Sequence, residues 1–269
     1  MKRLLNLDRR WIFAIIFLAV ALPLLWPIGL SGDVSPHTQA LYDRVESLPE
    51  GSAIIVSFDC EASSWPEIGP IAEALVRHAF RRNLKIIGTS FLSEGTSLGY
   101  ELLRRAADSA GRAYGTDWVY LGFRPQYVAA ILGMGESIRS VYSEDFLGRD
   151  VQEYPLLQSV QAYRDISLVV SIADDSMPQY WIDYAGTRYS VPIAAGLSAV
   201  MVTTFTPFLD SGQLTGLAGG LKGAAEYETL LGIPGAGIRG MDAQSSAHVA
   251  IILLVIVGNV AFFASRRKP

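Results

Sequence analysis

Two long apolar stretches lie near the ends of the 269-residue chain. Residues 11–30 contain no charged side chain, and residues 247–264 contain no Asp, Glu, Lys or Arg. A helix of about 20 apolar residues is long enough to cross the hydrocarbon layer of a bilayer, which is ~30 Å thick. The pattern therefore predicts one transmembrane helix near each end, with the lipid bilayer as a partner.

Basic residues flank both stretches and orient them. Residues 1–10 and 265–269 together carry seven Lys and Arg side chains. Basic residues beside a membrane span are retained on the cytoplasmic side. Both short ends are therefore predicted to be cytoplasmic, and residues 31–246 to form an extracytoplasmic domain. We expect a two-pass protein of the cell membrane.

Two other topologies are open. The N-terminal stretch has the basic start and apolar middle of a cleaved signal peptide, but its apolar run is long and Gly29-Leu30-Ser31 is a poor cleavage site. Residues 191–209 also lack charge, yet they contain two prolines. A third crossing there would place the basic C-terminus outside, so two crossings are favoured.

Between the ends, short apolar runs alternate with stretches of helical periodicity. Residues 53–58 (AIIVSF) are rich in β-branched side chains, as in a strand that is covered on both faces. Strands alternating with helices indicate a parallel sheet with right-handed crossovers. We therefore expect a doubly wound, Rossmann-like α/β core over residues 52–231, with about five strands at 53–58, 84–91, 118–122, 166–172 and 192–198.

The helices of this core are also marked in the sequence. Ser64 and Glu67 have the spacing of a capping box, which predicts a helix that runs to about Arg82. A second helix is expected over 97–114, ended by Gly115. Residues 232–246 are glycine-rich at their start and are interpreted as a flexible tether to the second span.

The charge of the middle of the chain limits the kinds of partner that we expect. Without the terminal basic residues and Asp8, the middle of the chain carries 15 Lys and Arg against 25 Asp and Glu. Proteins that bind nucleic acid need clustered Lys and Arg to displace phosphate counterions. A nucleic-acid partner is therefore not expected.

Few residues offer nucleophilic or zinc chemistry. Cys60 is the single cysteine, so no internal disulfide can form. The three histidines are His37, His78 and His248, and His78 belongs to a helix that leads away from Cys60. A Cys–His pair, a zinc site and a serine hydrolase with a G-x-S-x-G elbow are all disfavoured.

The candidate site lies where the predicted strands end. Ligands of doubly wound sheets bind beyond the carboxyl ends of the strands, and carboxylates there suit Mg²⁺ or Ca²⁺. Asp, Ser and Thr at these positions also cap the next helix, which is the simpler interpretation. The candidate ligand or metal residues are Asp59, Glu61, Thr89, Ser90, Arg124, Asp174 and Asp175.

A glycine-rich segment, residues 211–228, carries a second candidate surface. It contains neither the P-loop pattern nor G-x-G-x-x-G. If the segment is helical, its glycines form a smooth face that admits a close neighbour, as in membrane helix pairs. The predicted interaction face comprises Gly212, Gly216, Gly219, Gly220 and Gly223.

These features favour a structural or interaction subunit of a membrane assembly, with membrane proteins or further copies of the chain as partners. Catalysis is less favoured because no base accompanies a nucleophile. The first alternative is a hydrolase or transferase that uses a divalent metal at the carboxylate edge. The second alternative is a domain that binds a small solute.

Overall fold

The computed structural model describes residues 8–29 and 32–266. Six parallel strands form one sheet in the order β3-β2-β1-β4-β5-β6. The chain winds from β1 to one edge, then returns to β4 beside β1 and winds to the other edge, which is the Rossmann arrangement. The strands are β1 (Ala53–Asp59), β2 (Lys85–Ser90), β3 (Trp118–Phe123), β4 (Ile166–Ala173), β5 (Ile193–Leu197) and β6 (Leu217–Gly219).

The Rossmann-like α/β prediction is confirmed, with six strands rather than about five. The missed strand is β6, which is three residues long and lies inside the glycine-rich segment. Residues 191–209 contain β5 and α11 (Val202–Asp210) rather than one long helix. Pro192 and Pro207 are thus part of the globular domain, and this segment gives no third crossing.

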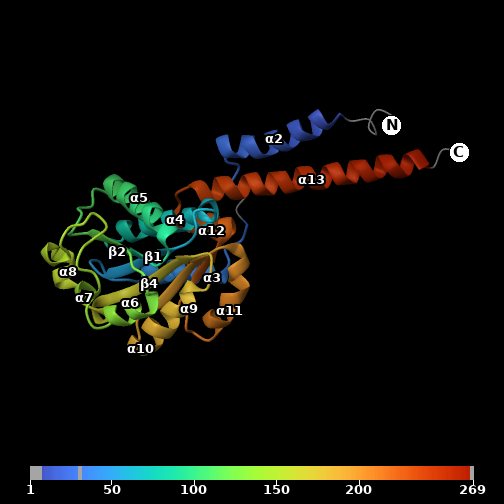
Figure 1. The fold of residues 1–269 in the computed structure, drawn as a ribbon. Helices are drawn as coiled ribbons and strands as arrows, with labels where there is room; N and C mark the ends of the chain where they lie inside the picture. Colours follow the sequence, from blue (N-terminus) through green and yellow to red (C-terminus); the bar gives the residue numbers. More distant parts are fainter. Residues whose placement is uncertain (1–7, 30–31, 267–269) are drawn as a thin grey trace.

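Helices cover both faces of the sheet (Figure 1). Successive side chains of a strand point to opposite faces, so β1 places Val56 and Phe58 in one core layer and Ile55 in the other. The first layer is completed by α3 (Pro36–Glu46), α4 (Trp65–Arg81), α5 (Ser93–Ala110) and α12 (Gly220–Leu231). The second layer contains α6 (Tyr127–Met134), α7 (Ile138–Val141), α8 (Pro155–Ser159), α9 (Met177–Trp181) and α11.

Helix α5 differs from its prediction at both ends. It begins at Ser93 and ends at Ala110, whereas residues 97–114 were expected. Gly111 caps it with a left-handed φ of 65°, a conformation that costs glycine little. Gly115 also has a positive φ, but it lies in the following loop. The helix therefore ends at the first of two suitable glycines.

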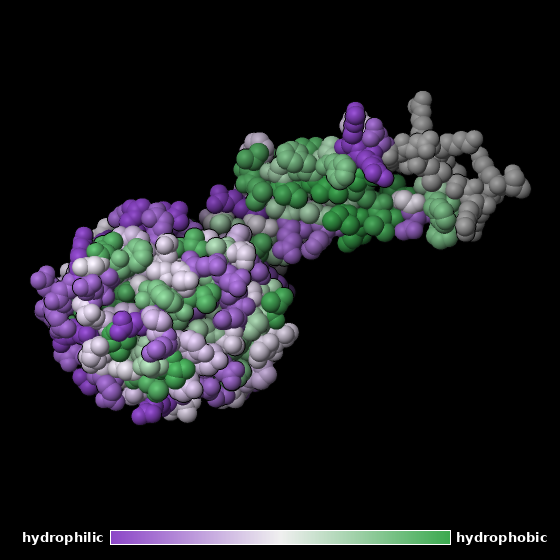
Figure 2. All heavy atoms as spheres, viewed as in Figure 1, coloured by the Kyte–Doolittle hydropathy of each residue, from purple (hydrophilic) through white to green (hydrophobic). Residues whose placement is uncertain are grey.

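An arm of two helices projects from the domain. Helix α2 (Arg9–Leu25) runs toward the domain and α13 (Ala236–Arg266) runs away from it, alongside α2 (Figure 1). Hydrophobic side chains cover much of the arm, in contrast to the mixed surface of the domain (Figure 2). Exposed examples include Trp11, Phe13, Phe17, Ile252, Val260 and Phe263.

By length and composition, one of the described helices can cross a membrane, and it lies within Ala236–Phe263. Helix α2 has only 17 residues, so the second span expected at 11–30 is not shown. Its end at Leu25 has a local cause. Trp26 precedes Pro27 and takes an extended conformation, with φ −129°, because a following proline disfavours the helical region.

The flexible tether expected over 232–246 is mostly helical. Helix α13 begins at Ala236, so only four residues separate it from the end of α12. The buried carboxylate of Glu228 accepts hydrogen bonds from the backbone N–H groups of Gly235, Gly237 and Ile238, at 2.8–2.9 Å. This cap satisfies N–H groups that a helix start leaves free, and α12 passes almost directly into α13.

Candidate functional site at the carboxyl edge of the sheet

The topological switch point lies between β1 and β4. These strands are hydrogen-bonded neighbours, with Asp59 paired with Ala173 at their ends. The loops that follow them are also joined, because the Glu61 N–H donates to Asp174 Oδ2 at 3.1 Å and the Ser64 hydroxyl donates to the same oxygen. Two of the predicted residues, Glu61 and Asp174, therefore meet.

An open hollow of about 360 Å³ lies beside this junction. Its lining is mainly acidic, and Asp175 belongs to it together with Glu61 and Asp174. Partial desolvation, followed by the nearby Asp174 carboxylate, raises the pKa of Asp175. The hollow is lined by Glu61, Ser64, Glu67, Leu92, Asp174, Asp175, Ser198 and Val200.

Glu67 is a lining residue that the sequence analysis assigned to another role. The expected capping box is wrong, because neither Ser64 nor Glu67 caps α4. The Ser64 hydroxyl binds Asp174, and Glu67 Oε1 accepts from the N–H of Ala199 at 2.7 Å. The spacing of Ser64 and Glu67 correctly predicted a helix start, but both side chains form hydrogen bonds with residues that are distant in the sequence.

Asp59 is separate from the hollow. Its side chain is fully buried and accepts from the N–H of Phe91 at 2.7 Å, with the Ser171 hydroxyl at 3.3 Å and Trp181 Nε1 at 3.4 Å. Burial raises its pKa to about 6, since the charged form loses its hydration. Asp59 holds together the ends of β1, β2 and β4 and does not face solvent.

Thr89, Ser90 and Arg124 do not line the hollow either. The Thr89 hydroxyl bonds to Tyr142 at 2.6 Å, and the Ser90 hydroxyl donates to the carbonyl oxygen of Phe58 at 2.7 Å. Arg124 is exposed, with its guanidinium 5.7 Å from the ring centre of Tyr142. The seven candidates thus divide into an open acidic group, the buried Asp59 and three residues with local structural bonds.

Cys60 is unsuited to nucleophilic chemistry. It is buried, and desolvation followed by the charge of Asp174 raises the pKa of its thiol to about 12. The thiolate, which is the reactive form, is therefore scarce at neutral pH. In the part of the chain that the structure describes, no three His, Cys, Asp or Glu side chains are grouped to hold a metal. Binding of Mg²⁺ or Ca²⁺ stays a prediction.

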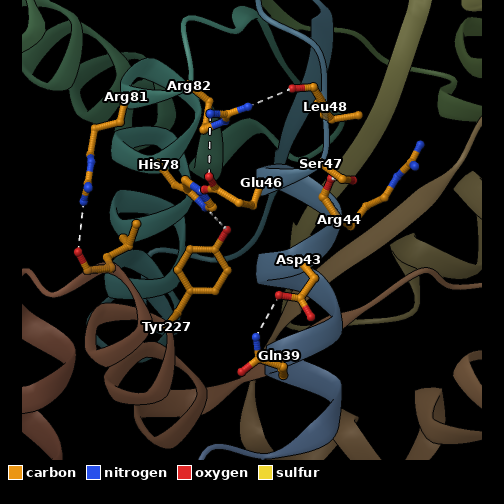
Figure 3. Close-up of polar contacts among 11 residues, drawn as sticks. Gln39, Asp43, Arg44, Glu46, Ser47, Leu48, His78, Arg81, Arg82 and Tyr227 are labelled. Carbon is orange, nitrogen blue, oxygen red and sulfur yellow. Dashed lines mark hydrogen bonds and ion pairs between the residues drawn. The ribbon is translucent and has the colours of Figure 1, made fainter.

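A chain of hydrogen-bonded polar side chains joins three helices of the first core layer (Figure 3). His78 Nε2 bonds to Glu46 Oε2 at 2.7 Å, and His78 Nδ1 bonds to the Tyr227 hydroxyl at 2.9 Å. Burial lowers the pKa of His78, against the opposing effect of Glu46. Tyr227 has no exposed surface and His78 almost none, whereas Glu46 reaches solvent, so the chain connects α3, α4 and α12 with only its Glu46 end exposed.

The predicted glycine face is not on one helix. Residues 217–219 are β6, and α12 begins only at Gly220. A Cβ at Gly216 would lie 2.3 Å from the backbone nitrogen of Leu41, and one at Gly219 would lie 2.1 Å from Val202. Gly220 and Gly223 also make close approaches within the chain, whereas Gly212 faces open space with a φ of +76°. The segment packs inside its own domain.

No family model matches the sequence, and no curated protein matches it. A trehalose-6-phosphate synthase, OtsA, is 10% identical with a TM-score of 0.27; the match covers 90% of this chain and 48% of that one. The chain thus spans about half of that synthase. A sugar ABC transporter substrate-binding protein from Bordetella parapertussis 12822 is 12% identical with a TM-score of 0.20, covering 71% and 86%. Similarities this low carry no functional argument.

Proposed function

We propose that this protein is an extracytoplasmic α/β domain, anchored to the cell membrane by both ends of its chain, that acts as an interaction subunit of a membrane assembly. The observation that carries the proposal is the paired arm. Although α2 is shorter than a typical span, it lies against α13 and exposes large apolar side chains along its length. Burying such a surface in lipid is favourable.

Buried acidic side chains join the arm firmly to the domain. Asp242 of α13 is 1% exposed and accepts from the N–H groups of Ile28 and Gly29 at 2.7 and 2.8 Å. Glu226 of α12 accepts from the hydroxyls of Ser35 and Thr38 at 2.6 and 2.7 Å. Together with the Glu228 cap, these bonds hold both of the segments that connect the arm to the domain. A rigid connection suits a protein that holds a partner at a set orientation to the membrane.

Labelling in intact cells tests the topology. A Ser109→Cys substitution places a thiol on the exposed surface of the domain, and Lys268→Cys places one in the basic tail. We expect a membrane-impermeant maleimide to label the first variant directly and the second only after permeabilisation. Cys60 is buried, so the unsubstituted chain serves as the blank. Labelling of both variants, or of Lys268→Cys alone, would contradict the two-pass arrangement.

The mass of the solubilised particle tests the assembly. The chain alone has a mass of 29.2 kDa. After extraction in mild detergent and correction for bound detergent, light scattering should give a larger protein mass. A particle with the mass of one chain would contradict the proposed subunit role, whatever the topology.

A second candidate function is solute binding at the acidic hollow. Ser198 is 5% exposed, lines the hollow, and its hydroxyl has no partner among the described residues. Four lining carboxylates favour a cationic ligand, including Mg²⁺ or Ca²⁺. Thermal unfolding with millimolar Ca²⁺, Mg²⁺ or a diamine should show stabilisation in the native chain and none in Asp174→Asn. Equal responses in both would exclude this site.

A further inference from the structure

A second hollow lies between the last turns of α4 and α5, away from the carboxyl edge of the sheet. It has a volume of about 630 Å³, within the range of small-molecule sites. Its apolar floor contains Phe80, Leu102 and Ala106, and Ile233 closes one end. We call it the arginine groove, because its rim carries Arg77, Arg81, Arg105 and Arg112.

The rim is positively charged on a domain that is otherwise acidic. Glu73 is the one carboxylate that lines the groove, and it pairs with Arg77. Arg105 has a longer contact with Glu101, at 3.6 Å. Among the described residues, Arg81 and Arg112 have no carboxylate within ion-pair distance. A positive rim on a chain with 15 basic and 25 acidic residues in its middle selects an anion.

Helix-end bonds use only part of these guanidinium groups. Arg81 Nη1 donates to the carbonyl oxygen of Leu231 at 2.9 Å, and Arg112 Nη2 donates to that of Phe80 at 2.6 Å. Arginine has five N–H donors in a fixed fork, so most of the donors of Arg81 are left for a ligand. Arg112 has fewer, because its Nη2 also donates to Asn83 Oδ1 and its Nε is buried. These bonds hold the two forks in place, which reduces the entropy lost when an anion binds.

We propose that the arginine groove binds one acidic phospholipid, with the phosphate on the guanidinium groups and the hydrocarbon part on the apolar floor. Guanidinium groups suit phosphate oxygens, and the apolar floor distinguishes a lipid from inorganic phosphate. Ile233 lies three residues before α13, so the groove is at the root of the arm. That the lipid comes from the membrane rests on the proposed anchoring. The affinity of the groove for the lipid does not depend on that anchoring.

The test uses the full chain in a neutral maltoside detergent. Native mass spectrometry measures the binding of dioleoylphosphatidylglycerol and of dioleoylphosphatidylcholine. We expect the acidic lipid to bind about tenfold more tightly or better, a difference of about 1.4 kcal/mol. Arg77→Glu combined with Arg105→Glu should remove this preference, and thermal unfolding checks that the variant is folded.

A second variant tests the apolar floor without changing charge. Ala110 lines the groove and is exposed, so Ala110→Trp fills the hollow and should weaken binding of the acidic lipid about tenfold. The control is Arg164→Glu with Arg188→Glu, two exposed arginines outside the groove, which should bind as the native chain does. The basic residues at the arm tip are the same in every variant, so differences report on the groove.

Each of the following outcomes overturns the proposal. The first is equal binding of the two lipids. The second is an equal loss in the control variant. The third is unchanged binding in Ala110→Trp, or displacement of the lipid by millimolar inorganic phosphate, either of which would assign the affinity to charge alone. None of these results bears on the labelling experiment, because binding in detergent does not depend on the direction in which the arm crosses a membrane.

Discussion

The sequence suggests Asp59 as a ligand or metal residue, but burial gives its carboxyl group a structural role. Three donors surround it, from Phe91, Ser171 and Trp181, and none of it is exposed. Its raised pKa comes first from desolvation. The side chain therefore ties strand ends together at a cost to stability when it is charged.

Asp59→Asn should change how stability depends on pH. The pKa of Asp59 is about 6 in the folded chain, against 3.8 as the reference value. The folded state therefore holds a proton that the unfolded chain has lost, and this group adds stability as pH falls from about 7 toward about 4. The full effect is on the order of 2–3 kcal/mol.

The measurement is the unfolding free energy of the native chain and of Asp59→Asn at pH 5 and pH 7.5. Other titrating groups are common to both proteins, so their difference isolates Asp59. The unfolding free energy of the native chain, relative to that of Asp59→Asn, should be larger at pH 5 than at pH 7.5. A difference that is the same at both pH values would show that Asp59 keeps an ordinary pKa.

Tyr227→Phe tests the polar chain of Figure 3. The substitution removes the hydroxyl that bonds His78 Nδ1 and leaves that buried nitrogen without its partner. The expected loss of stability is about 1–3 kcal/mol. Chemical denaturation measures it, with Tyr184→Phe as the matched control, because the half-buried Tyr184 stacks on Tyr180 and its hydroxyl has no hydrogen bond to another described residue. An equal loss of stability in both variants would show that the loss does not come from the hydrogen bond to His78.

Five of the six strands and the places of α4 and α5 were predictable, because apolar β-branched runs and helical spacing are local signals. The strand ends of β1 and β4 were also located correctly, which placed Glu61, Asp174 and Asp175 near one another. The rest depended on distant contacts. The short strand β6 is paired only through β5, and Glu67 found its partner Ala199 across the chain. Glycine spacing alone could not distinguish a helix face from close approaches within a sheet domain.

Gly216→Ala tests the new interpretation of the glycine-rich segment. The added Cβ would lie 2.3 Å from the Leu41 backbone nitrogen, so α3 must shift away from β6. We expect a loss of about 1–3 kcal/mol, as for other overpacked cores. Gly32→Ala is the control, because a Cβ there meets no atom within 4 Å. Equal stability of the two variants in denaturant would mean that this contact is loose.

The joint between arm and domain determines whether the two parts move together as one rigid body. Four features meet there: the α12–α13 connection, the Glu228 cap, the Asp242 bonds and the start of α3. Sequence patterns suggested a flexible tether at this point because glycines are frequent. Asp242 and Glu228 stiffen it through backbone N–H groups, and Glu226 through hydroxyls far away in the sequence, which no local residue pattern displays.

Glu228→Ala should loosen this joint while leaving the domain folded. Three backbone N–H groups at the start of α13 lose their acceptor, and the expected cost is about 1–3 kcal/mol of local stability. Hydrogen exchange of residues 233–246 should accelerate about tenfold or more. Glu136→Ala removes an exposed glutamate in the loop after α6 and is the control. Unchanged exchange in Glu228→Ala would show that packing alone holds the joint.

The pairing of α2 with α13 also sets an order of events during synthesis. Helix α2 is the first described helix to leave the ribosome and α13 the last, with the whole sheet between them. The domain can therefore finish folding while attached by a single leading helix, and the arm closes only after α13 has been synthesised. Contacts between chain ends this far apart form late, so a stalled or shortened chain would leave an apolar helix without its neighbour and open to chaperones or proteases.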